Sequence, residues 1–444
     1  MDAVYFPSMS VTAVILAAGR GSRLGARSKP LAIVGGVTLL ERAVATARAA
    51  GIGRIVVVVD ALDGAVASFC NSNVPGVEVA WSPDHARGNG ASVLSGLTHA
   101  GGRCLIMMVD HLHEPTTLER LLETPGDFVL AVDSLPSRVE LGDATLVRHE
   151  DGSAVEIAKR LPHFDSVDTG LVVCWADAVV ELGAVPGQEL EFNELKLAWI
   201  EHGHRIETME LDGAFWGDVD TPRDRKRAIA DLLDRYGSKT TDGPIARLIN
   251  RRLSRLASRC LLGTRIGPNS VTLANLALLV LSGALLALGA QEDALLILGG
   301  VLVQLSSALD GVDGELARVS GRSSELGGVL DALSDRYGDL AVFVGAAIAA
   351  DTTAAWPWAM AAVVANWQLS FVRREHERIV GSLPASHLRW QWSRDVRLLV
   401  LALSCVLLHP LWGLVTAAVV GNLDAVRRLI ALVRASRRGT AGNR

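Results

Sequence analysis

Two patterns of hydrophobic positions divide this chain of 444 residues. Up to about residue 235, short apolar runs rich in β-branched residues alternate with stretches of helical periodicity, and charged residues are spread among them. From about residue 270, long apolar stretches are separated by short polar turns. The first pattern is typical of an α/β domain, and the second is typical of a helical domain embedded in a membrane.

Five apolar runs in the first region predict β-strands. They are Thr12–Leu16, Arg54–Asp60, Val77–Trp81, Cys104–Asp110 and Phe128–Val132. Because helical segments separate these runs, we expect a Rossmann-like α/β domain with a mostly parallel sheet and helices on both faces. A polar, glycine-containing stretch at 237–246 follows, so we assign this domain to residues 1–235.

A basic segment joins the two regions. Arginines recur among leucines between Ile245 and Ile266, at Arg247, Arg251, Arg252, Arg255 and Arg259. This pattern predicts an amphipathic helix on the membrane surface, with a solvated linker helix as the alternative. We therefore assign residues 236–269 to a linker and a juxtamembrane helix.

Six apolar stretches predict an all-α, polytopic membrane domain over residues 270–444. They lie at about 271–290, 294–310, 327–350, 353–372, 398–409 and 411–426. Arginines cluster between the fourth and fifth stretches and after the sixth, whereas the turns on the other side contain neither lysine nor arginine. The positive-inside rule then predicts a multi-pass protein of the cell membrane, with the soluble domain and both termini in the cytosol. The first residues also lack the pattern of a cleaved signal peptide.

Composition narrows the range of partners. The net charge is −5 and no basic stripe crosses the soluble half, so a nucleic-acid partner is not expected. The five cysteines are not spaced like metal ligands, and they are typical of small core residues in a reducing compartment. The expected partners are the lipid bilayer and small phospho-alcohol substrates, and a homodimer through the membrane domain is left open.

Four carboxylates lie where the second apolar stretch ends and the third begins, at Asp310, Asp313, Asp331 and Asp335. A charge at the centre of a transmembrane helix costs roughly 2.5–3.5 kcal/mol on insertion scales, so four acids imply a bound cation or a wet cavity. Spacings of three and four residues place each pair on one face of its helix. Ligands that are all oxygen suit Mg²⁺ or Mn²⁺.

The segment from Asp310 to Asp335 resembles the CDP-alcohol phosphatidyltransferase family, whose signature is D-x2-D-G-x2-A-R-x8-G-x3-D-x3-D. All fixed positions are present, at Asp310, Asp313, Gly314, Ala317, Arg318, Gly327, Asp331 and Asp335. The resemblance implies that these aspartates hold metal on the pyrophosphate of a CDP-alcohol, and that Asp335 binds metal or accepts the proton of an attacking hydroxyl while CMP leaves.

Other residues of this region add to the expected site. Gly314, Ala317 and Gly327 leave room for the nucleotide, and Arg318 can neutralise a phosphate. Four more arginines are either ligands of an acceptor phosphate or ordinary positive-inside residues, namely Arg373, Arg374, Arg394 and Arg397.

The first strand leads into a glycine-rich loop, LAAGRGSRLGARSKPL. Gly19, Gly21 and Gly25 do not fit the dinucleotide spacing G-x-G-x-x-G, so NAD binding is not expected. Arg23 and Lys29 add positive charge instead. Backbone amides and two cations suit a nucleoside triphosphate that releases pyrophosphate.

This loop resembles that of the sugar-phosphate nucleotidyltransferases. The resemblance implies that Asp110 and one of Asp218 and Asp220 hold a metal ion at the α-phosphate, with the choice between the last two left open. The segment ARGNGAS looks like the base-reading segment of these enzymes, with Gly88, Asn89, Gly90 and Ser92, and a solvated turn is the alternative. ELGDATLV (140–147), Lys159 and VDTG (167–170) are expected on the sugar-phosphate side, where Lys159 is either a phosphate ligand or a surface lysine.

The order of these motifs resembles the bifunctional inositol-1-phosphate cytidylyltransferases and di-myo-inositol-phosphate-phosphate synthases. This implies a first reaction of CTP with inositol 1-phosphate, giving CDP-inositol and pyrophosphate. A second, metal-dependent reaction transfers phosphoinositol to another inositol 1-phosphate and releases CMP, with Mg²⁺ or Mn²⁺ at both sites. Among 43 basic residues only five are lysine, unlike a hyperthermophile. The alternative is therefore another phospho-alcohol or a lipid acceptor, as in phospholipid synthesis, beside a non-catalytic N-terminal binding module.

Overall fold

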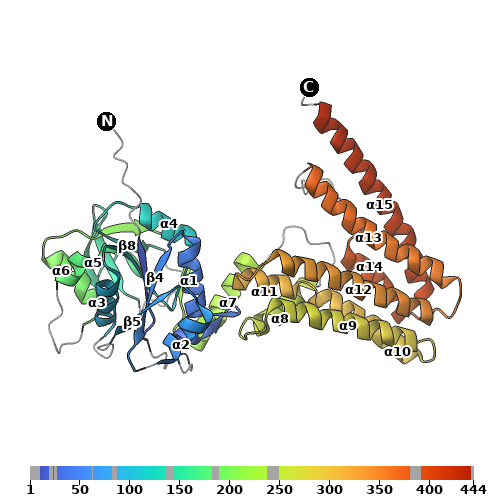
Figure 1. Ribbon diagram of the computed structural model, residues 1–444, viewed down its shortest axis with the longest axis horizontal. Helices are drawn as coiled ribbons and strands as arrows, with labels where there is room; N and C mark the ends of the chain where they lie inside the picture. Colours follow the sequence, from blue (N-terminus) through green and yellow to red (C-terminus); the bar gives the residue numbers. More distant parts are fainter. Residues whose placement is uncertain are drawn as a thin grey trace. The chain divides into compact units, whose positions relative to one another are not determined.

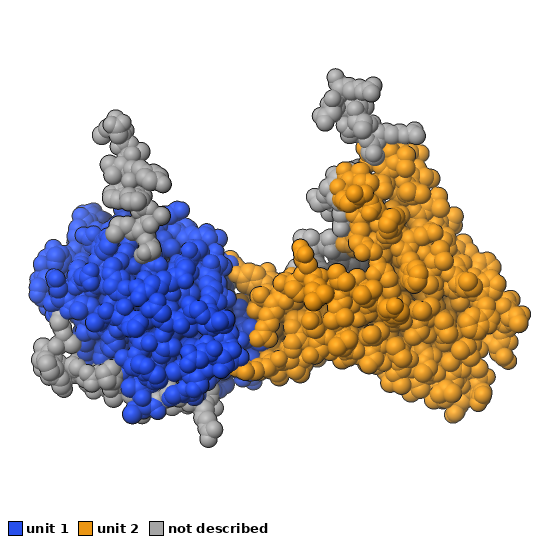
Figure 2. Space-filling view, viewed as in Figure 1, with its two compact units in different colours: residues 1–231 blue, residues 232–444 orange. Residues whose placement is uncertain are grey.

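The computed structural model divides into two compact units, residues 1–231 and 232–444, which are described separately (Figures 1 and 2). The residues described are 11–19, 24, 28–62, 64–82, 88–135, 142, 144–182, 190–237, 250–380 and 392–441. The division falls within the helix α7 (Pro222–Tyr236), close to the expected domain end at residue 235.

The first unit is built on a nine-stranded sheet of order β5-β4-β1-β6-β11-β8-β12-β10-β9. Its strands are β1 (Thr12–Leu16), β4 (Arg54–Asp60), β5 (Glu78–Ser82), β6 (Arg103–Met108), β8 (Phe128–Asp133), β9 (Leu146–Glu150), β10 (Ser153–Ala158), β11 (Ser166–Trp175) and β12 (Glu207–Glu210). All five expected strands are present within a few residues of their expected bounds. Four of them, β1, β4, β6 and β8, are mostly buried apolar runs, which suit a sheet covered on both faces, whereas β5 at the sheet edge includes exposed positions.

The expectation of a mostly parallel sheet is correct for one half of the sheet and wrong for the other. Strands β5, β4, β1 and β6 pair in parallel. Strand β11 then runs antiparallel to both β6 and β8, and β9 and β10 form an antiparallel pair at the far edge. Residues 140–170 are expected above only as substrate-binding segments, so β9, β10 and β11 are not among the predicted strands.

Helices cover both faces of this sheet (Figure 1). They are α1 (Leu39–Ala49), α2 (Gly64–Asn73), α3 (Asn89–Ala100), α4 (Pro115–Glu123), α5 (Ala176–Glu181) and α6 (Phe192–Glu201). Helix α3 packs closely, because a Cβ at Gly96 would lie 2.5 Å from Val14 Cγ1 and 2.7 Å from Val58 Cγ2. This close packing holds the second half of α3 against β1 and β4.

Three short elements complete the site edge of the sheet. A two-stranded ribbon pairs β7 (His111–His113) with β13 (Trp216–Asp218), and a 3₁₀ turn covers Lys29–Leu31. A small hairpin of β2 (Ile33–Val34) and β3 (Val37–Thr38) leads into α1. Thr38 caps that helix in a capping box with Glu41.

The second unit is entirely helical in the part of it that the structure describes. Its helices are α8 (Arg251–Leu261), α9 (Pro268–Leu288), α10 (Asp293–Leu309), α11 (Val312–Ser320), α12 (Glu325–Ala349), α13 (Ala355–Val380), α14 (Arg394–Val406) and α15 (Pro410–Ala441). Each of the six expected spans is therefore a helix. By length and apolar composition, Pro268–Leu288 and Asp293–Ser320 qualify as membrane spans among the described residues.

The helices α9 and α12 pack backbone against backbone. A Cβ at Gly345 would lie 2.1 Å from the carbonyl oxygen of Gly283, and a Cβ at Gly283 would lie 2.4 Å from that of Ala341. Small residues at such crossings are the usual means by which membrane helices approach closely. The core around this contact contains Leu279, Leu286 and Val342.

Candidate active sites

The transferase signature occupies the end of α10, the whole of α11 and the first half of α12. Asp310 follows α10, Asp313 lies in the first turn of α11, and Asp331 and Asp335 lie on successive turns of α12. Gly321 ends α11 in the left-handed conformation with φ of 68°, which reverses the chain. Ser324 then caps α12 by accepting from Gly327 N.

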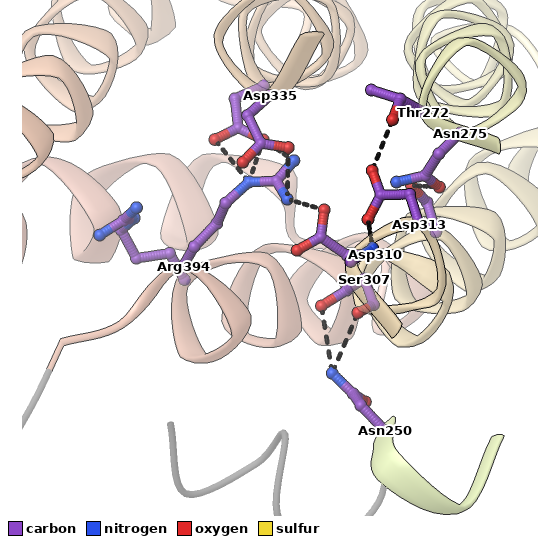
Figure 3. A network of polar contacts seen from close by, with 12 residues as sticks. Asn250, Thr272, Asn275, Ser307, Asp310, Asp313, Asp335 and Arg394 are labelled. Atoms are coloured by element: carbon purple, nitrogen blue, oxygen red, sulfur yellow. Dashed lines mark hydrogen bonds and ion pairs between the residues drawn. The ribbon is translucent and has the colours of Figure 1, made fainter. Parts of the chain in front are cut away.

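Three of the four signature aspartates converge. Asp310, Asp331 and Asp335 each offer a carboxylate oxygen within 4.8 Å of the others. Asp313 instead accepts hydrogen bonds from Thr272 Oγ1 and Gly314 N, each at 2.6 Å (Figure 3). The three convergent carboxylates are partly exposed and come from two helices, a set of hard oxygen ligands that fits a divalent cation.

A pocket opens beside these aspartates. It is lined by six positions of the signature, Asp313, Gly314, Ala317, Arg318, Gly327 and Asp331, and by Pro268, Asn269, Thr272, Arg322, Ser323, Ser324 and Gly328. Arg318 also donates to the carbonyl oxygens of Tyr236 and Gly237. The signature residues expected around the nucleotide are thus brought to one place.

Arg394 joins the aspartates from a third helix, α14. Its guanidinium lies 2.7 Å from Asp310 Oδ1 and 3.0 Å from Asp335 Oδ1 (Figure 3). It also pairs with Asp339 at 2.8 Å, and Asp339 in turn accepts from Asn366 Nδ2 at 2.6 Å. Sequence reasoning missed Asp339, although its spacing of four from Asp335 repeats the spacing between Asp331 and Asp335.

The other three candidate arginines lie elsewhere. Arg397 is buried and donates to Trp392 O at 3.0 Å and to Asn366 Oδ1, behind Arg394. Arg373 and Arg374 are exposed near the end of α13. Arg394 is therefore the candidate arginine that the structure places against the aspartates.

In the first unit, Lys29 forms ion pairs with both Asp110 and Asp220. Burial alone would lower the pKa of Lys29, but the two carboxylates outweigh it and hold that pKa above its usual value. Burial likewise opposes ionisation of Asp110, yet His111 and Lys29 lower its pKa overall. The three side chains therefore form a charged cluster at the carboxyl end of β6.

Asp218 lies apart from that ion pair. It ends β13 opposite His111 in the ribbon with β7. Burial raises its pKa, and the neighbouring Asp220 adds to the effect, against the opposing influence of His111. Asp110 and Asp220 thus share Lys29 as their cation, whereas Asp218 lies beside His111.

The remaining candidates of the nucleotidyltransferase loop are only partly placed. Gly19 is exposed just after β1, and Lys159 is exposed at the end of β10. Gly21, Arg23 and Gly25 lie outside the described residues. Their expected roles stay predictions.

The base-reading candidates pack against residues 190–192. Gly90 N donates to Leu190 O at 2.9 Å, and Asn89 Oδ1 accepts from Phe192 N at 2.7 Å. A Cβ at Gly88 would lie 2.6 Å from Leu190 O. Ser92 is buried with its Oγ 3.2 Å from Ser82 Oγ. These contacts fix the start of α3, and nucleobase recognition by the same residues stays a prediction.

Two residues near Asp110 were not found by sequence reasoning. His111 Nδ1 lies 2.7 Å from Thr169 O, and Gly170, with φ of 72°, lets the ring approach, because a Cβ there would lie 2.4 Å from Nδ1. Lys196 is 1% exposed and pairs with Asp168, which also accepts from Gly170 N at 2.7 Å. The detectable signal was a lysine within the apolar run LKLAWI.

Comparisons with known proteins agree with this division into two sites. Residues 13–149 match the family of MobA-like NTP transferase domains, and residues 265–426 match the CDP-alcohol phosphatidyltransferase family. The chain is 43% identical to the "Bifunctional IPC transferase and DIPP synthase" of Rubrobacter xylanophilus, over 96% of this chain and 97% of that protein. Proteins with the same title from Thermococcus kodakarensis and Archaeoglobus fulgidus are 34% and 32% identical, over 74% and 89% of this chain and 73% and 78% of theirs.

Proposed function

Because this chain belongs to the family of bifunctional IPC transferases and DIPP synthases, we propose that it makes and then consumes CDP-inositol. In the first unit, CTP and inositol 1-phosphate give CDP-inositol and pyrophosphate. In the second unit, phosphoinositol passes from CDP-inositol to a second inositol 1-phosphate, and CMP leaves. The convergence of Asp310, Asp331 and Asp335 beside the signature pocket carries the second assignment.

In the nucleotidyltransferase site, the charged cluster positions the triphosphate. A phosphate oxygen of inositol 1-phosphate attacks the α-phosphorus of CTP, and the bond to pyrophosphate breaks. Asp110 and Asp220 are the pair that would hold Mg²⁺, because both carboxylates converge on one cation, Lys29. Lys29 neutralises charge on the departing pyrophosphate.

In the transferase site, a hydroxyl of the acceptor attacks the phosphorus that carries the inositol of CDP-inositol. Asp310, Asp331 and Asp335 would hold Mg²⁺ or Mn²⁺, and such an ion would supply positive charge to the pyrophosphate of the donor. We assign to Asp335, whose Oδ1 lies 3.0 Å from the guanidinium of Arg394, the acceptance of the proton of the attacking hydroxyl. Asp313, held by Thr272, lines the pocket wall against the nucleotide.

The second unit is a membrane protein domain, and we assign six crossings to α9, α10, α12, α13, α14 and α15. Large exposed side chains on these helices, such as Leu281, Val301, Trp367 and Trp412, are those that a lipid environment accommodates. With arginines clustered from the end of α13 to the start of α14 and along the second half of α15, both termini are cytosolic. CDP-inositol is then made and used on the same side of the membrane.

The test supplies CTP, Mg²⁺ and inositol 1-phosphate to the protein in vesicles that contain no CDP-linked lipid, and follows products by phosphorus NMR. We expect CDP-inositol first, then CMP with a phosphodiester product. Ready cytidylylation of another phospho-alcohol, with none of inositol 1-phosphate, would overturn the inositol assignment. CMP release that required CDP-diacylglycerol would instead identify a phospholipid synthase.

A further inference from the structure

Helix α8 contacts the transferase signature through a row of buried polar side chains. Asn250, Ser254 and Ser258 follow one another at intervals of four, so they lie along one helix face, and each is at most 5% exposed. Ser254 Oγ donates to Glu315 Oε1 at 3.1 Å, and Ser258 Oγ donates to Glu315 Oε2 at 2.6 Å. Both oxygens of one buried carboxylate in the signature are thus held by α8.

The same face of α8 holds the chain before Asp310. Asn250 Nδ2 donates to the carbonyl oxygen of Ser307 at 3.2 Å (Figure 3), and Gln304 Nε2 donates to Asn250 Oδ1 at 3.3 Å. Ser307 precedes Asp310 by one helical turn, and Glu315 follows Asp313 directly after Gly314. Helix α8 is therefore bonded on both sides of the DGVDG segment.

Helix α11 connects these hydrogen bonds to the pocket. Asp313, Gly314, Ala317 and Arg318 line the pocket, while Glu315 lies buried against α8. Because Glu315 and these lining residues belong to one helix of nine residues, a shift of α8 that moves Glu315 also moves the pocket wall. The position of α8 thus bears on how the donor nucleotide is bound.

The opposite face of α8 combines exposed leucines with arginines. Leu253 is 45% exposed and Leu256 is 63% exposed, and Arg252 and Arg259, seven residues apart, lie exposed on the same side. A face of this kind inserts its leucines at the membrane interface while its arginines pair with phosphate groups of anionic lipids.

We infer that α8 binds an anionic lipid surface and transmits this binding, through Ser254, Ser258 and Glu315, to the donor pocket of the transferase. The inference rests on the proposed function of the second unit. Headgroup phosphates fix Arg252 and Arg259, and the serine row then holds α11 where CDP-inositol binds best. The nucleotidyltransferase site has no part in this coupling.

The experiment uses the full chain in vesicles of phosphatidylcholine alone or of phosphatidylcholine mixed with phosphatidylglycerol. CMP release from supplied CDP-inositol is measured beside pyrophosphate release from CTP as the internal control. A polarity-sensitive dye on Cys260, the exposed one of the five cysteines, reports insertion of the leucine face of α8. We expect the KM for CDP-inositol to fall several-fold on anionic vesicles, with the rate of pyrophosphate release unchanged.

Two pairs of substitutions separate lipid binding from its transmission. Arg252→Gln/Arg259→Gln should lose both the dye response and the change in KM, whereas Arg434→Gln, at an exposed arginine of α15, should keep both. Ser254→Ala/Ser258→Ala should keep the dye response and lose the change in KM.

An equal KM on the two kinds of vesicle, or a serine pair that retains the full change in KM, would overturn the inference. CMP release that is independent of lipid would still support the proposed reaction. Absence of CMP release from CDP-inositol in every vesicle would instead contradict the proposed function itself.

Discussion

At the scale of single residues, each site contains a cation shared between carboxylates. Lys29 links Asp110 with Asp220, and Arg394 links Asp310, Asp335 and Asp339. Breaking a buried ion pair by removing one partner is costly because it leaves a charge uncompensated. Substitutions at these shared cations should therefore affect both stability and chemistry.

Lys29→Gln should lower pyrophosphate release by about 10²-fold or more, since the leaving group loses a cation. It should also lower the melting temperature of the first unit in magnesium-free buffer, and Mg²⁺ should restore part of the loss by neutralising Asp110 and Asp220. Differential scanning calorimetry with and without Mg²⁺ tests this. If Mg²⁺ did not change the melting temperature of this variant, the assignment of these two carboxylates as the metal ligands would be contradicted.

The same cluster predicts a pH dependence of stability. Folding lowers the pKa of Asp110. Its ionised carboxylate therefore stabilises the folded state fully above the pKa of an aspartate in the unfolded chain, near 4, and this stabilisation is lost as pH falls through the lower pKa of the folded state. The pKa of Lys29 is raised, so its contribution is complete below about pH 10 and is lost as pH rises through the folded value. The stability difference between wild type and Lys29→Gln, measured by urea unfolding, should be constant between these limits.

Asp339→Asn should weaken the anchor of Arg394 without touching the pocket. Partners of this kind orient metal ligands, and their removal typically costs about 10–100-fold in metal affinity or activity. Mn²⁺ titration followed by electron paramagnetic resonance measures the affinity directly, beside CMP release. Asp424→Asn, a buried acid of α15 paired with Arg427 and Arg428, is the matched control and should leave Mn²⁺ affinity unchanged.

At the scale of elements, strands were predicted most accurately from the sequence where the run of apolar residues was continuous. Strands β1 and β4 have the expected bounds because both are uninterrupted apolar runs, buried throughout except at Arg54. Strands β9 and β10 are short and partly exposed, and Gly170 interrupts the long run of β11, so their apolar pattern is weaker. In the transferase, the signature identified all four aspartates. It could not predict that three of them converge while Asp313 turns to Thr272, because that depends on where α9 places Thr272.

Gly345→Ala tests the crossing of α9 and α12. The new methyl group would meet the carbonyl of Gly283, so the helices must separate, at a cost of about 1–3 kcal/mol for overpacking. Thermal unfolding in detergent should show a lower melting temperature, and CMP release should fall with it. Gly267→Ala, where a Cβ meets nothing within 4 Å, is the control, and an equal effect of both changes would argue against the crossing.

At the scale of the whole molecule, two reactions are joined in one chain with separate sites. Asp110→Ala should stop pyrophosphate release and spare CMP release from supplied CDP-inositol. Asp335→Asn should do the reverse, with a loss of about 10²–10⁴-fold in CMP release for a missing proton acceptor. The motif order predicted this arrangement from sequence, because each half carries its own complete set of acids.

Mixing the two variants in the same vesicles should restore the full reaction, since CDP-inositol made by Asp335→Asn can reach the transferase of Asp110→Ala. The restored rate per enzyme molecule should rise with protein concentration. The rate per molecule of the wild type should not, because its linked sites raise the local concentration of the intermediate. Product formation measured over a dilution series tests this. No recovery at any concentration would mean that the intermediate is never released.

The backbone contact between Gly283 and Gly345 also bears on how warming affects the donor pocket. Packed side chains loosen on heating by exchanging rotamers, but a contact made of main-chain atoms has no rotamers to exchange. Thr272 of α9 and Asp331 of α12, which both line that pocket, are therefore held at a separation that depends little on temperature. The turnover of the transferase should then follow a straight Arrhenius line up to the onset of unfolding.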